Sequence, residues 1–270
     1  MNVRTHDRAL TSSPRDLSRG TPQRPLHPPV QAVILAAGMG TRLGRSTPKC
    51  LTALGDGRTI LTRQLDALRG AFGDDVAITA VVGYRSKRIM TAAPELLFAY
   101  NPWFETTNTS KSLLRGLLSS RPGGVLWLNG DVVFDPAVLE VVAEAVHRDV
   151  SFVCTDTSVV GDEEVKYTVD DAGFIAGLSK TVSGGLGEAV GINYVSTADK
   201  PVLIEHLRGC GDQDYFERGI ETAIAEHGLR VLPLDISAFG AVEVDFESDL
   251  ERANTLFRGP LLDALAVEAG

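Results

Sequence analysis

AVILAAGMGTRLGRSTPK, residues Ala32–Lys49, joins a short apolar run to a glycine-rich turn and two cations. The apolar run at its start predicts a buried β-strand. Gly38 and Gly40 follow, and glycine lets a backbone approach a ligand closely and adopt dihedral angles that other residues resist. Arg42 and Lys49 come next. Exposed N–H groups and cations at the end of a strand suit the phosphate chain of a nucleoside triphosphate.

Two common phosphate-binding motifs do not fit this stretch. The dinucleotide fingerprint G-x-G-x-x-G fails because Gly44 comes one residue too late, and the Walker A loop fails because Lys49 follows Pro48 rather than glycine. The string instead resembles the signature L-A-A-G-x-G-x-R…P-K of the nucleotidyltransferases that make nucleotide sugars and CDP-activated compounds. The resemblance extends over about residues 30–257.

The resemblance implies a Rossmann-like α/β/α sandwich of three layers, with a mixed, mostly parallel sheet and a small β insertion at about residues 160–190. It implies that Arg42 and Lys49 are catalytic, because they would neutralise the departing pyrophosphate. The nucleotide-binding residues that it implies are Leu35, Ala36, Ala37, Gly38, Gly40, Thr41, Arg42 and Lys49.

The order of apolar runs along the chain independently predicts an α/β fold. Residues 1–29 are rich in Arg, Pro, Ser and Thr and predict a disordered tail. From residue 30 to 257, strand-like runs alternate with helical patterns, which is typical of a mostly parallel sheet covered by helices. Residues 258–270 form a C-terminal extension. Strands are expected at 32–36, 77–82, 96–100, 125–128, 151–154, 165–169, 174–178, 229–233 and 242–245, and helices at 60–68, 109–118, 136–147, 198–207, 215–225 and from 247.

Composition excludes several classes of protein. A chain of 270 residues predicts one domain, or one domain with an insertion. Its net charge of −9 argues against non-specific binding to nucleic acid, and no apolar run is long enough to cross a membrane. The three cysteines, Cys50, Cys154 and Cys210, lack metal-binding spacing and fit reduced thiols, so a cytoplasmic protein is expected.

Two aspartates follow apolar strands and predict a magnesium site. Asp131 follows the run Val125–Leu128, and Asp245 ends the run AVEVD. In an open parallel sheet, ligands bind at the carboxyl ends of strands, and Mg²⁺ prefers carboxylate oxygens. An ordinary Asn-Gly-Asp turn is the alternative for Asp131. The resemblance implies that both are metal ligands, whereas Glu247 to Asp249 suit the start of a helix.

The resemblance also implies residues around the acceptor. Lys166 and Lys180 flank the predicted hairpin and would be catalytic by reaching the phosphates, although solvated charges are the alternative. Glu188 would line the acceptor pocket. The spacing of Asn101, Asn108 and Ser112 resembles the CTP-dependent branch, which makes Asn108 and Ser112 acceptor-binding candidates. Lys111 and Arg115 lie one helical turn apart, so they would bind an anionic acceptor if their helix face meets the pocket.

A quaternary-ammonium acceptor such as phosphocholine would instead favour an aromatic cage. The candidates for such a cage are Trp103, Phe104, Tyr167, Tyr194 and Tyr215. The histidines (His6, His27, His147, His206 and His227) show no metal-ligand spacing, and no nucleophilic triad is evident.

The expected reaction is transfer of a nucleotidyl group, with CTP favoured as donor and Mg²⁺ as cofactor, to a small phosphonate- or phosphocholine-like acceptor. One alternative is activation of a sugar-1-phosphate with UTP, CTP or dTTP, and another is a non-catalytic nucleotide sensor. The expected partners are these small molecules, without nucleic acid or membrane; a homodimer is left open.

Overall fold

The computed structural model describes residues 29–158 and 164–256. The predicted tail, apart from Pro29, and the C-terminal extension lie outside these ranges, as do residues 159–163 within the predicted insertion. Within them, the main sheet has nine strands, seven of which follow the order β10-β6-β9-β4-β1-β2-β3, while β7 and β8 are attached through β9. The strands are β1 (Gln31–Ala36), β2 (Ala77–Val82), β3 (Leu97–Tyr100), β4 (Val125–Asn129), β5 (Val132–Phe134), β6 (Phe152–Asp156), β7 (Lys166–Val169), β8 (Ile175–Ser179), β9 (Glu188–Val195), β10 (Leu232–Asp235) and β11 (Ala241–Glu243).

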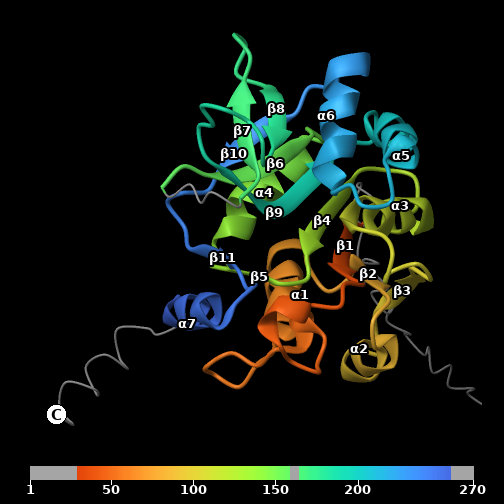
Figure 1. The fold of residues 1–270 in the computed structure, drawn as a ribbon, viewed down its shortest axis with the longest axis vertical. Helices are drawn as coiled ribbons and strands as arrows, with labels where there is room; N and C mark the ends of the chain where they lie inside the picture. The colour runs from red at the N-terminus through yellow and green to blue at the C-terminus, as the bar shows by residue number, and fades with distance from the viewer. Residues whose placement is uncertain (1–28, 159–163, 257–270) are drawn as a thin grey trace, which may run out of the picture.

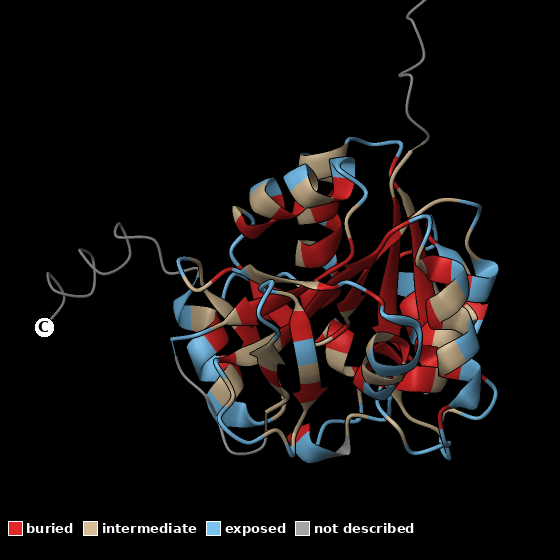
Figure 2. Cartoon of the chain, turned by 90° about the horizontal axis from the view of Figure 1, so that it is seen from above, coloured by how far each residue is buried: buried red, intermediate tan, exposed pale blue. Residues whose placement is uncertain are grey.

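Helices cover both faces of this sheet. The α-helices are α1 (Ile60–Phe72), α2 (Ser86–Ala92), α3 (Thr109–Ser119), α4 (Val138–His147), α5 (Lys200–Gly209), α6 (Phe216–His227) and α7 (Glu247–Thr255). One buried core joins the sheet to α1, α2 and α4, and a second joins its other face to α3, α5 and α6. Figure 2 shows the buried strands running between these helices, and the outer surfaces of the helices are exposed. The predicted three-layer α/β/α sandwich is therefore confirmed.

The apolar patterns explain the local structure. All six residues of β1 are buried, as the initial apolar run predicts. Helix α1 places Leu61, Leu65 and Leu68 on one buried face, and Thr59 caps its start by accepting a hydrogen bond from the Thr62 N–H. The predicted hairpin is also present as β7 and β8, which Figure 1 shows beside α6.

Strand β9 is an element that the sequence analysis did not predict. It runs antiparallel to β4 and β6 near the middle of the sheet, whereas β1 is parallel to both β2 and β4. Gly191 interrupts it with a φ of +70°, and a side chain there would come within 2.7 Å of the Asn129 amide. This glycine hides the strand from a pattern search, because glycine is depleted in strands. Short elements α2 and β5 were also missed.

Candidate active site

The carboxyl ends of β1 and β4 form the floor of the site. These two strands are parallel neighbours, and the Gly130 N–H donates a 2.9 Å hydrogen bond to the Leu35 carbonyl. The glycine-rich turn therefore leaves β1 beside the turn that carries Asp131. A second, two-stranded sheet of β5 and β11 brings the segment before Asp245 beside Asp131. Glu243 pairs with Val132, and the Val244 N–H donates to the Asp131 carbonyl at 3.0 Å. This pair lies between α1 and α7 in Figure 1.

The two predicted cations and the two predicted metal ligands meet at this point. Lys49 Nζ donates to Asp131 Oδ2 at 3.1 Å and also to Asp245 Oδ1. Arg42 Nη1 donates to Asp245 Oδ2 at 2.6 Å. The side chains of Lys49, Asp131 and Asp245 are 15%, 20% and 27% exposed, whereas that of Arg42 is 54% exposed, so the group is partly buried with Arg42 at its surface. We call these four residues the cation–carboxylate cluster.

Charge pairing sets the ionisation of the cluster. Burial lowers the pKa of Lys49, but the Asp131 and Asp245 carboxylates outweigh it and hold that pKa above its usual value. Burial raises the pKa of Asp245, but Lys49 and Arg42 together lower it by more, so the pKa lies below its usual value. Asp245 raises the pKa of Arg42. Lys49, Arg42 and Asp245 are thus charged at neutral pH, which suits binding of both an anionic phosphate chain and a divalent cation.

The two carboxylates fit a magnesium ion. They come from different elements, yet oxygens of both contact the one ammonium of Lys49. A single cation can therefore contact both, and carboxylate oxygens are the ligands that Mg²⁺ prefers. Bound there, Mg²⁺ would supply charge neutralisation for phosphate oxygens. Asp131 and Asp245 remain the predicted ligands.

The backbone of Gly40 packs closely against the side chain of Lys49. Its φ is +59°, and a Cβ at this position would lie 2.6 Å from Lys49 Cγ. The positive φ and the contact both require glycine, since other residues reach this region at a cost. The turn that resembles the family signature therefore packs directly against its lysine.

Sequence reasoning missed a buried carboxyl group behind the cluster. Glu243 Oε1 accepts a 3.1 Å hydrogen bond from Asn129 Nδ2. Its pKa is raised well above the usual value, first by burial and then by Asp131 and Asp245. A signal was present in the sequence, because the strand expected at 242–245 contains both Glu243 and Asp245, and residues two apart in a strand face the same side.

Gln64 supports the turn that carries Asp131. This buried side chain, on α1, donates from Nε2 to the carbonyls of Asn129 and Val132, both at 2.8 Å. We expect Gln64→Leu to leave these acceptors unpaired and to cost about 1–3 kcal/mol of folding free energy, or a Tm lower by about 5 °C. Thermal unfolding checks this. Gln213→Leu is the control, because the exposed Gln213 also donates to one carbonyl, of Thr106, at 2.8 Å; an equal loss in both variants would contradict the supporting role.

Tyr215 interacts with both the predicted catalytic Lys180 and Arg42 of the cluster. The Lys180 ammonium lies 5.4 Å from the centre of the Tyr215 ring, and Tyr215 also contributes, after Asp245, to the raised pKa of Arg42. Lys166 opens β7 and is the register partner of Glu188 at the start of β9. Lys180 thus shares Tyr215 with the cluster, whereas Lys166 and Glu188 lie together at the base of the hairpin. Their roles remain predictions.

The predicted acceptor residues around α3 make contacts within the protein. Asn101 Nδ2 donates to Ser112 Oγ at 3.3 Å, and Asn108 caps α3 by accepting from the Thr109 N–H at 2.8 Å. The Lys111 ammonium donates to the carbonyls at the end of α5, with Leu207 and Arg208 at 3.4 Å and Cys210 closer. Arg115 stacks 5.0 Å from the centre of the Trp103 ring. Lys111, Arg115 and Trp103 line a hollow of about 390 Å³. No member of the cation–carboxylate cluster lines it.

These contacts lead us to expect a structural effect from Lys111→Met. It should lower Tm, because three carbonyls at the end of α5 lose their charged donor, while the acceptor KM stays unchanged. Arg115→Met, one turn along the same helix, is the comparison variant. A raised acceptor KM with an unchanged Tm for Lys111→Met would support acceptor binding instead.

The five aromatic candidates do not gather into a cage. In the described part of the chain, no ring contact joins any two of them. Trp103 faces Arg115, Phe104 packs on Tyr84 and Tyr194 stacks on Phe152, while Tyr215 faces Lys180. Tyr167 is buried in the second core. This arrangement gives a quaternary ammonium no enclosed site of the type that we considered.

Comparison with known proteins decides the family. Residues 32–209, about two thirds of the chain, match the MobA-like NTP transferase domain. The chain belongs to this family. It therefore carries a nucleotidyltransferase domain, and the matched range contains the glycine-rich turn, both cations that follow it and Asp131.

This MobA-like NTP transferase has a curated relative and similar solved structures. The relative is CMP-5'-(3-aminopropyl)phosphonate synthase of Streptomyces rubellomurinus (strain ATCC 31215), 31% identical over 262 residues; the match covers 86% of this chain but only 39% of the relative's length. CTP:phosphocholine cytidylyltransferase from Streptococcus pneumoniae has a TM-score of 0.69 at 18% identity, covering 85% of this chain and 99% of that one. An inositol-1-phosphate CTP transferase from T. maritima has a TM-score of 0.67 at 17% identity, covering 85% and 96%. At these identities the solved structures show the fold alone.

Proposed function

We propose that this nucleotidyltransferase transfers CMP from CTP to a small phosphonate, with an aminoalkylphosphonate as the favoured acceptor. The observation that carries the proposal is the convergence of Asp131 and Asp245 on Lys49, beside a glycine-rich turn and Arg42. The curated relative supports the choice of CTP and of a phosphonate, since its name specifies a CMP-phosphonate product. The absence of a formed cage among the five aromatic candidates favours a primary amine over the quaternary ammonium of phosphocholine.

The proposed chemistry balances without a general base. An acceptor phosphonate oxygen that is already an anion near neutral pH attacks the α-phosphorus of CTP. A bond forms between that oxygen and phosphorus, and the bond from the α-phosphorus to the bridging oxygen of the β-phosphate breaks. Pyrophosphate leaves with the electron pair. The lack of a nucleophilic triad is consistent with such a step, because its barrier comes from anion repulsion and from orientation.

The protein would lower this barrier by charge and position. The turn from Gly38 to Arg42 would bind the β- and γ-phosphates through its N–H groups, and Arg42 and Lys49 would neutralise the leaving pyrophosphate. Binding of phosphates and Mg²⁺ would require Lys49 to release one or both carboxylates, and Asp131 and Asp245 would then hold the metal. Lys180, held against Tyr215, and Lys166 would stabilise the charge at the α-phosphorus.

Pyrophosphate release tests the proposal. The assay uses Mg²⁺, each of the four nucleoside triphosphates in turn, and a panel of 3-aminopropylphosphonate, 2-aminoethylphosphonate, a carboxylated phosphonate, phosphocholine and glucose-1-phosphate. We expect release with CTP and an aminoalkylphosphonate. Release only with a hexose-1-phosphate would move the acceptor to the sugar class and overturn the phosphonate proposal, and nucleotide binding without release from any acceptor would favour a sensor.

A further inference from the structure

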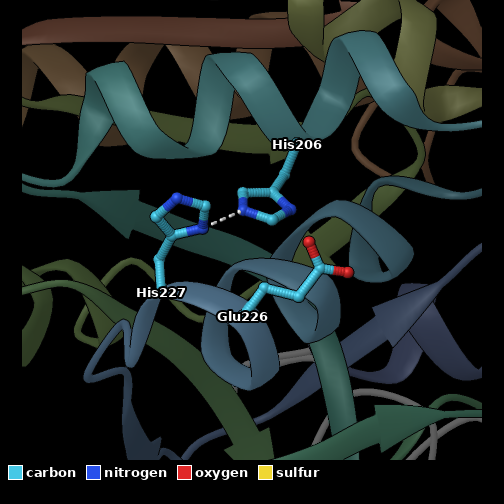
Figure 3. Close-up of side chains that lie close together, drawn as sticks. All are labelled: His206, Glu226 and His227. Atoms are coloured by element: carbon cyan, nitrogen blue, oxygen red, sulfur yellow. Dashed lines mark hydrogen bonds between the residues drawn. The ribbon is translucent and has the colours of Figure 1, made fainter.

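Two histidines that lie far apart in the sequence meet on the outer helices of the second face. His206 belongs to α5 and His227 is the last residue of α6, and the two ring nitrogens His206 Nε2 and His227 Nδ1 are 2.8 Å apart. The carboxylate of Glu226 completes the group, so that one ligand atom of each residue lies within 4.8 Å of the others. Figure 3 shows the three side chains directed toward one another. Sequence spacing gave no sign of this group, because the packing of α5 on α6 creates it.

The hydrogen bonds around His206 are compatible with the tautomer that a metal ligand needs. Thr222 Oγ1 donates its proton to backbone carbonyls, of Arg218 at 3.0 Å and Gly219 at 3.2 Å. His206 Nδ1 lies 2.9 Å from the same oxygen, so it can donate to Thr222 Oγ1 while the hydroxyl proton goes to one of these carbonyls. In that tautomer of the neutral ring, Nε2 is unprotonated and its lone pair faces His227 Nδ1. A histidine whose other nitrogen is held by such a hydrogen bond is the usual form of a metal ligand.

We propose that His206, His227 and Glu226 bind a divalent transition-metal ion, with Zn²⁺ as the favoured ion. Two imidazole nitrogens and a carboxylate match zinc rather than magnesium or calcium, which prefer oxygen ligands. The metal takes the place of the proton now shared by the two rings, and His227 carries its proton on Nε2 instead, so a neutral pair undergoes no net protonation change. Two nitrogens on one tetrahedral zinc are about 3.3 Å apart, so zinc binding requires the rings to separate by about 0.5 Å and to turn until both lone pairs point at the ion.

The surroundings favour a cation at this point. His227 ends α6, and the carbonyl end of a helix carries partial negative charge. His227 and Glu226 are exposed, which leaves open positions for water. The site is also separate from the cation–carboxylate cluster. Tyr215, which faces Lys180, immediately precedes α6. This helix has 12 residues, so His227 at its end lies about 18 Å from Tyr215 along the helix axis. A bound ion would therefore act by joining α5 to α6.

Zinc titration of the full chain without an affinity tag tests the site. The titration is done in excess Mg²⁺, so that the oxygen-ligand site is not available to zinc, and is followed by calorimetry, by Tm and by X-ray absorption at the zinc edge. We expect one equivalent to bind with two imidazole ligands and to raise Tm, since a ligand that binds only the folded state stabilises it. Thr222→Val should weaken binding about 10- to 100-fold by releasing His206.

Variants of the ligands decide the outcome. His227→Gln removes a ligand at an exposed position and should weaken zinc binding more than Thr222→Val does, with an unchanged Tm in the absence of zinc. His206→Ala should also weaken zinc binding more than Thr222→Val does. His147→Ala is the matched control, because His147 packs on Phe72 at the end of another helix and should leave zinc binding unaffected. Equal zinc affinity in wild type, His206→Ala and His227→Gln, or an absorption spectrum without imidazole ligands, would overturn the proposal.

Discussion

Asp131→Asn is expected to lower kcat for nucleotidyl transfer about 10²- to 10³-fold, the usual effect of removing one charge-stabilising group from a transition state. The substitution keeps the size of the side chain but removes the negative charge that Lys49 contacts at 3.1 Å and that we propose binds Mg²⁺. The apparent affinity for Mg²⁺ should fall with it. Initial rates at varied Mg²⁺ concentration, with CTP and acceptor saturating, measure both effects.

The control for this variant is another aspartate in an ion pair. Asp66 pairs with Arg58 at 3.0 Å, and both side chains are about half exposed. Such surface pairs contribute little, so Asp66→Asn should leave kcat and the Mg²⁺ dependence unchanged. Near-normal turnover of Asp131→Asn, with the same response to Mg²⁺ as wild type, would contradict the metal assignment.

Gly40→Ala is expected to lower kcat/KM for CTP on the order of 10²-fold, because small misplacements of a positioned catalytic group have effects of this size. The new Cβ would lie 2.6 Å from Lys49 Cγ, and alanine at a φ of +59° is strained. The turn and Lys49 must then move apart, although no charge is lost. Steady-state kinetics with varied CTP measures the effect.

Gly70→Ala separates this effect from a general effect of adding a methyl group. Gly70 lies in α1, where a Cβ would meet nothing within 4 Å and φ is not positive. Replacing it should stabilise the helix by up to about 1 kcal/mol and leave kcat/KM unchanged. If Gly40→Ala retained the wild-type kcat/KM, Lys49 would not need its observed position.

The sequence was most informative where one segment carries both a structural and a chemical pattern. The run from Ala32 to Lys49 predicted a buried strand, the turn and both cations, and the structure places all of them at one strand end. The two aspartates were singled out as candidates for a similar reason, since each comes at or just after the end of an apolar run. Their meeting at Lys49 depends on the pairing of β5 with β11, which no local pattern reveals.

The features that the sequence did not reveal depend on contacts between distant segments. Strand β9 lacks a clear alternation because Gly191 interrupts it and its last six residues are all buried, although it joins the two halves of the sheet. Lys111 looked available for an acceptor, but the end of α5 supplies three carbonyls for its ammonium. His206 and His227 show no ligand spacing, yet they are hydrogen-bonded across α5 and α6. Packing between helices decides the environment of each of these side chains.

Phosphorus-31 NMR of a reaction mixture tests the central claim most directly. The mixture contains the protein, Mg²⁺, CTP and 3-aminopropylphosphonate. We predict that the phosphonate resonance is replaced by that of a mixed phosphonate–phosphate anhydride, with pyrophosphate formed in equal amount, and that neither product accumulates with Asp131→Asn over the same time. Unchanged CTP and phosphonate with the wild-type protein, under conditions where CTP binds, would contradict the proposal that the cation–carboxylate cluster performs this transfer.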